Sequence, residues 1–62
     1  MYHLLKNTRI NFVIIVSPND EYYPTYIKYG YEKIKEGTYK AMEQMQKIIV
    51  EEFLNTLPNE TN

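Results

Sequence analysis

The sequence predicts an α+β fold in which an N-terminal β-strand or β-hairpin is followed by one or two α-helices, a β(β)αα order. Apolar residues alternate in residues 9–16, as in a strand, and recur every three to four residues in 38–57, as in an amphipathic helix. The chain has 62 residues and no cysteine. We therefore expect one small domain, residues 1–62, that needs a stabilising partner in place of disulfides.

The first predicted element is a strand over residues 9–16, within a strand or hairpin region at about 2–16. One face of the strand carries Ile10, Phe12, Ile14 and Val16. The other face becomes apolar at Val13 and Ile15, which is typical of a strand covered on both faces. Because 62 residues cannot easily cover both faces, we expect a second subunit. Residues 2–5 form a first strand through a turn at 6–8, or precede a lone strand that pairs across a dimer axis.

A turn at residues 17–20 ends this strand, because Pro, Asn and Asp are typical turn residues. We expect the next helix to cover about 22–36, with Pro24 in its first turn, where proline is tolerated. Gly37 then suits the position after a helix, and Thr38 suits the N-cap of the next one. One helix running through Gly37 is the alternative, since an internal glycine costs only about 1 kcal/mol.

The last predicted helix covers about 38–57, and a disordered tail follows at 58–62. Its apolar residues recur at helical spacing and extend beyond the about 100° stripe that packing on one sheet needs. We therefore predict that the helix is buried on two sides, with the second side facing another copy in a homodimer or larger homo-oligomer. The predicted self-interface consists of Val13, Ile15, Met42, Met45, Ile49, Phe53 and Leu57.

Five of the seven tyrosines lie in the predicted helix at 22–36. Tyrosine is enriched at interfaces, because its rigid ring gives a large contact area with a polar group at its end. We therefore predict a surface that binds another protein. It is formed by Tyr22, Tyr23, Tyr26, Tyr29 and Tyr31. The alternative is an aromatic rim around the core of a small protein that lacks tryptophan.

No catalytic, cofactor or metal site is expected. The chain has no thiol and a single histidine, His3, near the N-terminus, where chains tend to fray. The neighbouring carboxylates at 20–21 and 51–52 point about 100° apart on a helix, so neither pair forms an acid–base dyad. The longest apolar run, residues 12–16, is far shorter than the about 20 residues of a membrane span. We expect a cytoplasmic protein without a membrane partner.

The formal net charge is −1, and Arg9 is the only arginine. This balance disfavours nucleic acid, whose binding proteins carry a basic excess. A strand, a helix, a glycine and a second helix nevertheless resemble the ribbon-helix-helix fold in layout. The resemblance is carried by residues 9–16, 22–36, Gly37-Thr38 and 39–57. It implies a dimeric DNA-binding transcriptional regulator in which Arg9 and Asn11 contact bases, although Val13 and Ile15 on the same strand face depart from the family.

By elimination, we expect a small non-enzymatic protein-binding regulator or inhibitor. Lysine, isoleucine, asparagine and tyrosine are over-used, and their codons are rich in A and T. This usage is typical of low-GC bacteria and their phages. The expectation is therefore a phage or mobile-element protein that blocks a defence or transcription protein in the host cytoplasm. The ribbon-helix-helix-like DNA-binding regulator is the alternative.

Overall fold

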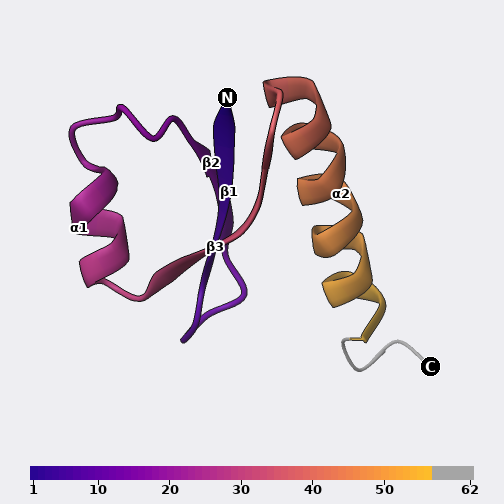
Figure 1. Ribbon diagram of the computed structural model, residues 1–62. Coiled ribbons are helices and arrows are strands. Elements are labelled where there is room, and N and C mark those ends of the chain that lie inside the picture. The colour runs from indigo at the N-terminus through magenta and orange to yellow at the C-terminus, as the bar shows by residue number, and fades with distance from the viewer. Residues whose placement is uncertain (57–62) are drawn as a thin grey trace.

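The computed structural model describes residues 1–56, which form a three-stranded antiparallel sheet with one helix on each face (Figure 1). The elements are β1 (Tyr2–Asn7), β2 (Val13–Val16), α1 (Tyr23–Lys28), β3 (Tyr31–Gly37) and α2 (Tyr39–Thr56). The strand order β2-β1-β3 places β1 at the centre. The predicted α+β class with N-terminal strands is confirmed. The predicted tail at 58–62 and the predicted interface residue Leu57 lie outside the described residues.

The two N-terminal strands form a hairpin, one of the two arrangements that the sequence left open, but its expected boundaries were wrong. β2 begins at Val13, and residues 8–12 form the loop in place of a turn at 6–8. The cause is Asn7, whose Oδ1 accepts hydrogen bonds from the backbone N–H groups of Arg9 (2.8 Å) and Ile10 (3.2 Å). These bonds curl the chain away from an extended course. The Asn7 N–H then closes the loop on the Phe12 carbonyl, 2.9 Å away.

The turn that ends β2 is confirmed. The Asp20 N–H donates to the Ser17 carbonyl (3.0 Å), and the Asn19 N–H donates to the Ser17 hydroxyl (3.2 Å). Asp20 Oδ1 in turn accepts from the Tyr22 N–H at 2.8 Å, just ahead of α1. Pro24 lies in the first turn of that helix, as predicted.

The predicted helix over 22–36 is wrong beyond Lys28. Gly30 adopts φ +99°, a left-handed conformation that glycine reaches without steric cost, and its N–H donates to the Ile27 carbonyl at the end of α1. The chain then reverses into β3, which pairs with the free side of β1. The resulting order is ββαβα. The strand–helix–helix layout on which the ribbon-helix-helix resemblance rested is therefore absent from residues 1–56.

The pairing of β1 with β3 contains one irregularity. Leu4 lies opposite Lys35, whereas Leu5 lies opposite Lys33, so Ile34 has no partner on β1. An extra residue of this kind bends a strand and increases its twist. Most side chains of β3 are exposed, and four of them belong to lysine or glutamate. β3 therefore forms a charged, irregular edge of the sheet.

The main core lies between α2 and one face of the sheet. Leu4, Val13 and Met42 form its buried centre, and Ile15, Met45 and Ile49 pack against them. Leu5, also fully buried, points to the opposite face because successive side chains of a strand alternate. The sheet is thus covered on both faces, as the apolar pattern of β2 predicted. In this chain α1 and α2 themselves supply the two covers (Figure 1).

The start of α2 matches the sequence prediction. The Thr38 hydroxyl accepts from the Ala41 N–H at 3.2 Å, which satisfies one of the free donors at the helix N-terminus. Gly37 ends strand β3, so the predicted break between two helices and the alternative of one continuous helix are both wrong. A Cβ atom at Gly37 would lie 3.2 Å from Met42 Cε, so the connection is tight. No helix within residues 1–56 has the length and apolar character needed to span a bilayer.

The edge formed by β2 is short and apolar. In an antiparallel pair, successive residues turn their N–H and C=O groups to opposite sides of the strand. The Phe12 carbonyl faces β1, so the N–H and C=O of Val13 face away from β1, toward the open edge of the sheet. The Gln46 side chain of α2 donates its amide N–H to the Val13 carbonyl at 2.7 Å. The helix therefore covers one of the outward-facing acceptors of this edge.

Candidate protein-interaction surface

The structure separates the predicted partner-binding tyrosines into two groups. Tyr23, Tyr26 and Tyr31 are half-buried, whereas Tyr22 and Tyr29 lie at the two ends of α1 and are 60% and 61% exposed. The five tyrosines do not share one helix, because Tyr31 belongs to β3. Of the five, Tyr22 and Tyr29 are the most accessible to a partner.

Tyr23 is tied to the sheet through His3. Its hydroxyl lies 2.6 Å from His3 Nδ1, and the two rings meet edge to face with centroids 5.4 Å apart. His3 Nε2 lies 3.7 Å from a carboxylate oxygen of Glu36, and the His3 side chain is 15% exposed. His3 therefore sits in an ordered strand, and the expectation of a frayed position was wrong. Its ring links β1, α1 and β3.

A surface ion pair continues this cluster on β3. Lys33 Nζ donates to Glu36 Oε1 at 2.6 Å. This hydrogen bond, with the attraction between the two charges, lowers the pKa of the Glu36 carboxyl and raises the pKa of the Lys33 ammonium. Both side chains are exposed to solvent, so salt screens the pair.

The packing of α1 on the sheet is thin. Tyr26 and Tyr31 meet edge to face, with ring centroids 5.7 Å apart, and no residue of α1 is buried. Ile27 is 45% exposed. We call Tyr22 and Tyr29, which are seven residues apart and therefore lie on the same side of the helix, the α1 surface. A segment held by a hydrogen bond and edge contacts thus presents three large side chains to solvent.

The loop at residues 8–12 presents further apolar side chains. Ile10 is 58% exposed and Phe12 is 55% exposed, and the neighbouring Arg9 and Asn11 are also exposed. The sequence placed all four on the faces of a strand. The structure places them in the loop, so Arg9 and Asn11 do not belong to a strand face that could enter a DNA groove.

The exposure of Ile10 and Phe12 does not follow from the alternating pattern, although Asn7 carries a signal for a loop. Asparagine often accepts hydrogen bonds from the backbone two residues further on, which begins a turn. The alternation over 9–16 outweighed that signal, because the same residues satisfy a strand pattern. Asn7 itself is buried, and its Nδ2 group donates to the Tyr29 carbonyl at 3.2 Å.

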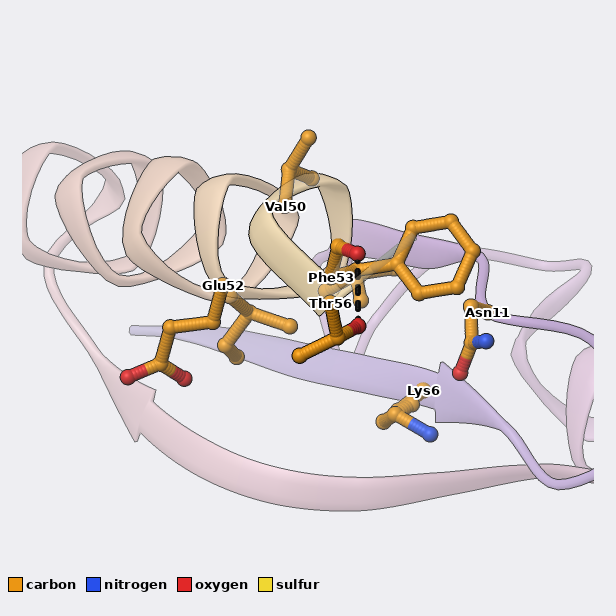
Figure 2. Close-up of a pocket in the computed structure, with 8 residues that line it drawn as sticks. Lys6, Asn11, Val50, Glu52, Phe53 and Thr56 are labelled. Atoms are coloured by element: carbon orange, nitrogen blue, oxygen red, sulfur yellow. Dashed lines mark hydrogen bonds between the residues drawn. The ribbon is translucent and has the colours of Figure 1, made fainter. Parts of the chain in front are cut away.

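A groove lies between the C-terminal half of α2 and the hairpin, with a volume of about 250 Å³. Figure 2 shows Phe53 and Thr56 above, from α2, and Lys6 and Asn11 from the hairpin. The Thr56 hydroxyl is turned back to the Phe53 carbonyl, 2.7 Å away. Glu52 lies at the other side of the groove (Figure 2). The groove is thus lined by both polar and apolar side chains.

Most residues of the predicted self-interface serve the core of the chain. Val13 and Met42 are 7% and 4% exposed, and Ile15, Met45 and Ile49 pack against them. Phe53 is half-buried beside the groove. Helical periodicity identified the buried residues, but not what covers them. Self-association remains a prediction, and it requires other side chains.

Within residues 1–56, no three histidine, aspartate or glutamate side chains gather as a metal site would require. Comparison of the chain with protein-family models, with curated proteins and with solved structures gave no match.

Proposed function

We propose that this chain is a small non-enzymatic protein-binding regulator or inhibitor, and that the α1 surface is its contact surface. The observation that carries the proposal is that α1 buries none of its residues while Tyr22 and Tyr29 are 60% and 61% exposed. An α1 that served only the core would turn these side chains inward.

The energetics of exposed aromatic rings support this proposal. Each Å² of apolar surface removed from water contributes about 25 cal/mol, and aromatic residues are enriched in the buried centres of interfaces. In the chain alone, the rings of Tyr22 and Tyr29 stay in contact with water and do not contribute this free energy. A protein partner that covered both rings would recover it.

The non-enzymatic character rests on how His3 is used. Its ring is engaged by Tyr23 and lies beside Glu36, so it holds three elements together. The proposed setting, a phage or mobile-element protein acting on a host protein in the host cytoplasm, rests on the AT-rich codon usage that the composition implies.

We also propose that the chain forms a homodimer through the outer side of α2. Val50 and Leu54 are 41% and 57% exposed and lie one turn apart on the same stripe. Analytical ultracentrifugation tests this: the mass should exceed 7.5 kDa and fall toward it on dilution or in Leu54→Ser. A mass of 7.5 kDa at every concentration would contradict it.

The α1 surface is tested by affinity capture from lysate of a low-GC bacterium, with the partner identified by mass spectrometry and re-tested as a purified protein. The double variant Tyr22→Ser/Tyr29→Ser should no longer bind this purified partner. Tyr39→Ser is the matched control, because Tyr39 is 51% exposed but lies at the start of α2. The control should bind as the wild type does.

Circular dichroism must show that both variants keep their fold. Equal binding by the double variant and the wild type would contradict the assignment of the α1 surface. Failure of the wild type to hold any purified partner would contradict the proposed function itself.

A further inference from the structure

The loop at residues 8–12 is pinned by hydrogen bonds, although its apolar side chains point to solvent. Asn7 Oδ1 accepts from the Arg9 and Ile10 N–H groups, and the Phe12 N–H donates to the Ile10 carbonyl at 2.9 Å. Asn7 is only 7% exposed, so its side chain lies largely out of water, where the loss of a hydrogen-bond partner is costly. The loop is therefore held in one shape, with Ile10 and Phe12 outward.

The same asparagine joins this loop to the α1 surface. Its Nδ2 donates to the Tyr29 carbonyl at 3.2 Å, and the next residue, Thr8, donates its N–H to the Gly30 carbonyl at 2.8 Å. The loop and the end of α1 therefore form one end of the molecule. We call the exposed side chains Arg9, Ile10, Phe12, Lys28 and Tyr29 the loop-end surface.

The charge of the loop-end surface is positive. Arg9 lies beside Ile10 in the loop, and Lys28 precedes Tyr29. The ion pairs found within residues 1–56 involve only His3, Lys33 and Glu36, so both cations are available to a partner. A guanidinium fork beside apolar side chains is complementary to a carboxylate at the rim of an apolar pocket.

We infer that the loop-end surface binds a protein segment that combines apolar side chains with flanking carboxylates. This inference rests on the proposed function and specifies the chemistry of its partner. Ile10 and Phe12 enter the apolar part, Arg9 pairs with a carboxylate at its rim, and Asn7 acts as the positioning residue that preorganises the loop. Preorganisation strengthens binding because less freedom is lost on association.

Charge and shape favour such a protein segment over nucleic acid or an anionic membrane. Glu52 lies across the groove from Asn11 of the loop. A broad anionic surface would bring its own charges against Glu52, whereas a narrow segment that contacts only Arg9, Ile10 and Phe12 would not.

The experiment uses the full chain, immobilised, and a displayed library of random 12-residue peptides as the probe. Enriched peptides should combine Leu, Phe or Trp with Asp or Glu. One synthetic enriched peptide should bind about tenfold more weakly to Arg9→Glu and to Phe12→Ser, as expected for interface anchors. Two matched controls should stay within about twofold of the wild type. They are Lys40→Glu, an exposed cation on α2, and Ile48→Ser, whose isoleucine is 51% exposed.

The role of Asn7 has its own readout. Asn7→Ala should weaken the binding of the same peptide. It should also speed trypsin cleavage after Arg9, because the loop loses the hydrogen bonds that hold its shape. Asn7→Asp keeps the Oδ1 acceptor for the Arg9 and Ile10 N–H groups but loses the Nδ2 donor to the Tyr29 carbonyl, so its cleavage should be slower than in Asn7→Ala and faster than in the wild type. If Asn7→Ala does not fold, Asn7→Asp alone decides: cleavage as slow as in the wild type would count against the positioning role.

The inference is overturned if no peptide is enriched, if the enriched peptides lack carboxylates, or if Arg9→Glu binds them as tightly as the wild type. It is also overturned if a 20-nucleotide DNA strand, or vesicles of equal parts phosphatidylglycerol and phosphatidylcholine, bind the chain through Arg9 more tightly than any peptide does. Capture of a purified partner through the α1 surface alongside these results would leave the proposed function standing and remove only the loop-end assignment.

Discussion

The two faces of the sheet are covered by different physical means. On the α2 face, Leu4, Val13 and Met42 bury aliphatic surface against one another. On the α1 face, the helix is held by the contact of Tyr23 with His3 and by the edge of Tyr26 against Tyr31, and it buries none of its own residues. The α1 face also buries Leu5 and Val16 of the sheet, but the helix that covers them adds only a few directed contacts and no buried residue of its own.

This difference indicates how the molecule divides its tasks. Full burial of a leucine contributes about 1.5–3 kcal/mol, whereas a hydrogen bond contributes about 0.5–1.5 kcal/mol net. The packing of α2 on the sheet therefore contributes more to the free energy of folding than the contacts of α1 do. The α1 face supplies orientation, and it leaves its outer side chains available for contact.

The largest difference between the two faces is expected in the stability of Leu4→Ala compared with that of Leu5→Ala. Both leucines are fully buried, one on each face. Leu4→Ala should lower the free energy of unfolding by about 2–5 kcal/mol, because a cavity opens between two packed layers. Leu5→Ala should cost less, since the short α1 can move into the space. Urea unfolding followed by circular dichroism measures both, and a larger loss for Leu5→Ala would reverse the ranking of the two faces.

The turn that brings the chain from α1 to β3 should tolerate little change. Gly30→Ala should cost about 1–2 kcal/mol, because φ is +99° and a Cβ atom would also lie 3.3 Å from Thr8 Oγ1. Gly30→Asn is the matched control, since asparagine adopts left-handed conformations more readily. Thermal unfolding should rank the wild type above Gly30→Asn and Gly30→Ala last. An alanine variant as stable as the wild type would contradict the strain argument.

The hydrogen bond on the α1 face should have a smaller effect. Tyr23→Phe removes the hydroxyl that meets His3 Nδ1 and should cost about 0.5–1.5 kcal/mol. Tyr22→Phe, in which the lost hydroxyl belongs to an exposed ring, should leave stability unchanged. Hydrogen exchange of the α1 amides should quicken in Tyr23→Phe alone. Equal exchange in the two variants would show that ring packing, and not the hydroxyl, holds α1.

The smallest effect is expected from the exposed pair on β3. The hydrogen bond from Lys33 lowers the pKa of Glu36, so its contribution is present above the unfolded-state pKa and is lost as pH falls through the folded-state pKa. The raised pKa of Lys33 has the opposite sense: its contribution is lost as pH rises through the folded-state value.

An NMR titration of the Glu36 carboxyl should therefore show a higher midpoint in Lys33→Gln than in the wild type, with the difference shrinking in high salt. Lys35→Gln is the control, because the ion pairs within residues 1–56 do not include Lys35. Identical midpoints in the wild type and Lys33→Gln would contradict the pairing.

Local chemistry made part of this fold predictable from sequence. The turn at residues 17–20, the position of Pro24, the cap at Thr38 and the course of α2 follow from short-range sterics and hydrogen bonds. These features depend on a few neighbouring residues. The structure accordingly matches the expectation at each of them.

The segment at 31–37 could not be assigned in the same way. Its lysines and glutamates suit a helix, and only pairing with β1, more than 20 residues away, makes it a strand. Gly30 was the local signal for the reversal, and it was overlooked in favour of Gly37. The surface residues at Ile10 and Phe12 were misplaced for a related reason, since the alternation favoured a strand that Asn7 interrupts.

The Gln46 amide on the Val13 carbonyl bears on how far the sheet can extend. An unpaired edge strand rich in valine and isoleucine is a template on which further chains add, the route to aggregation that soluble sheets must block. β3 blocks it with charge and an unpaired residue at Ile34. β2 has neither charged side chains nor an unpaired residue. At this edge the Gln46 side chain of α2 occupies the Val13 carbonyl, an acceptor that an added strand would require. The helix that completes the core thus also limits polymerisation at the weaker edge.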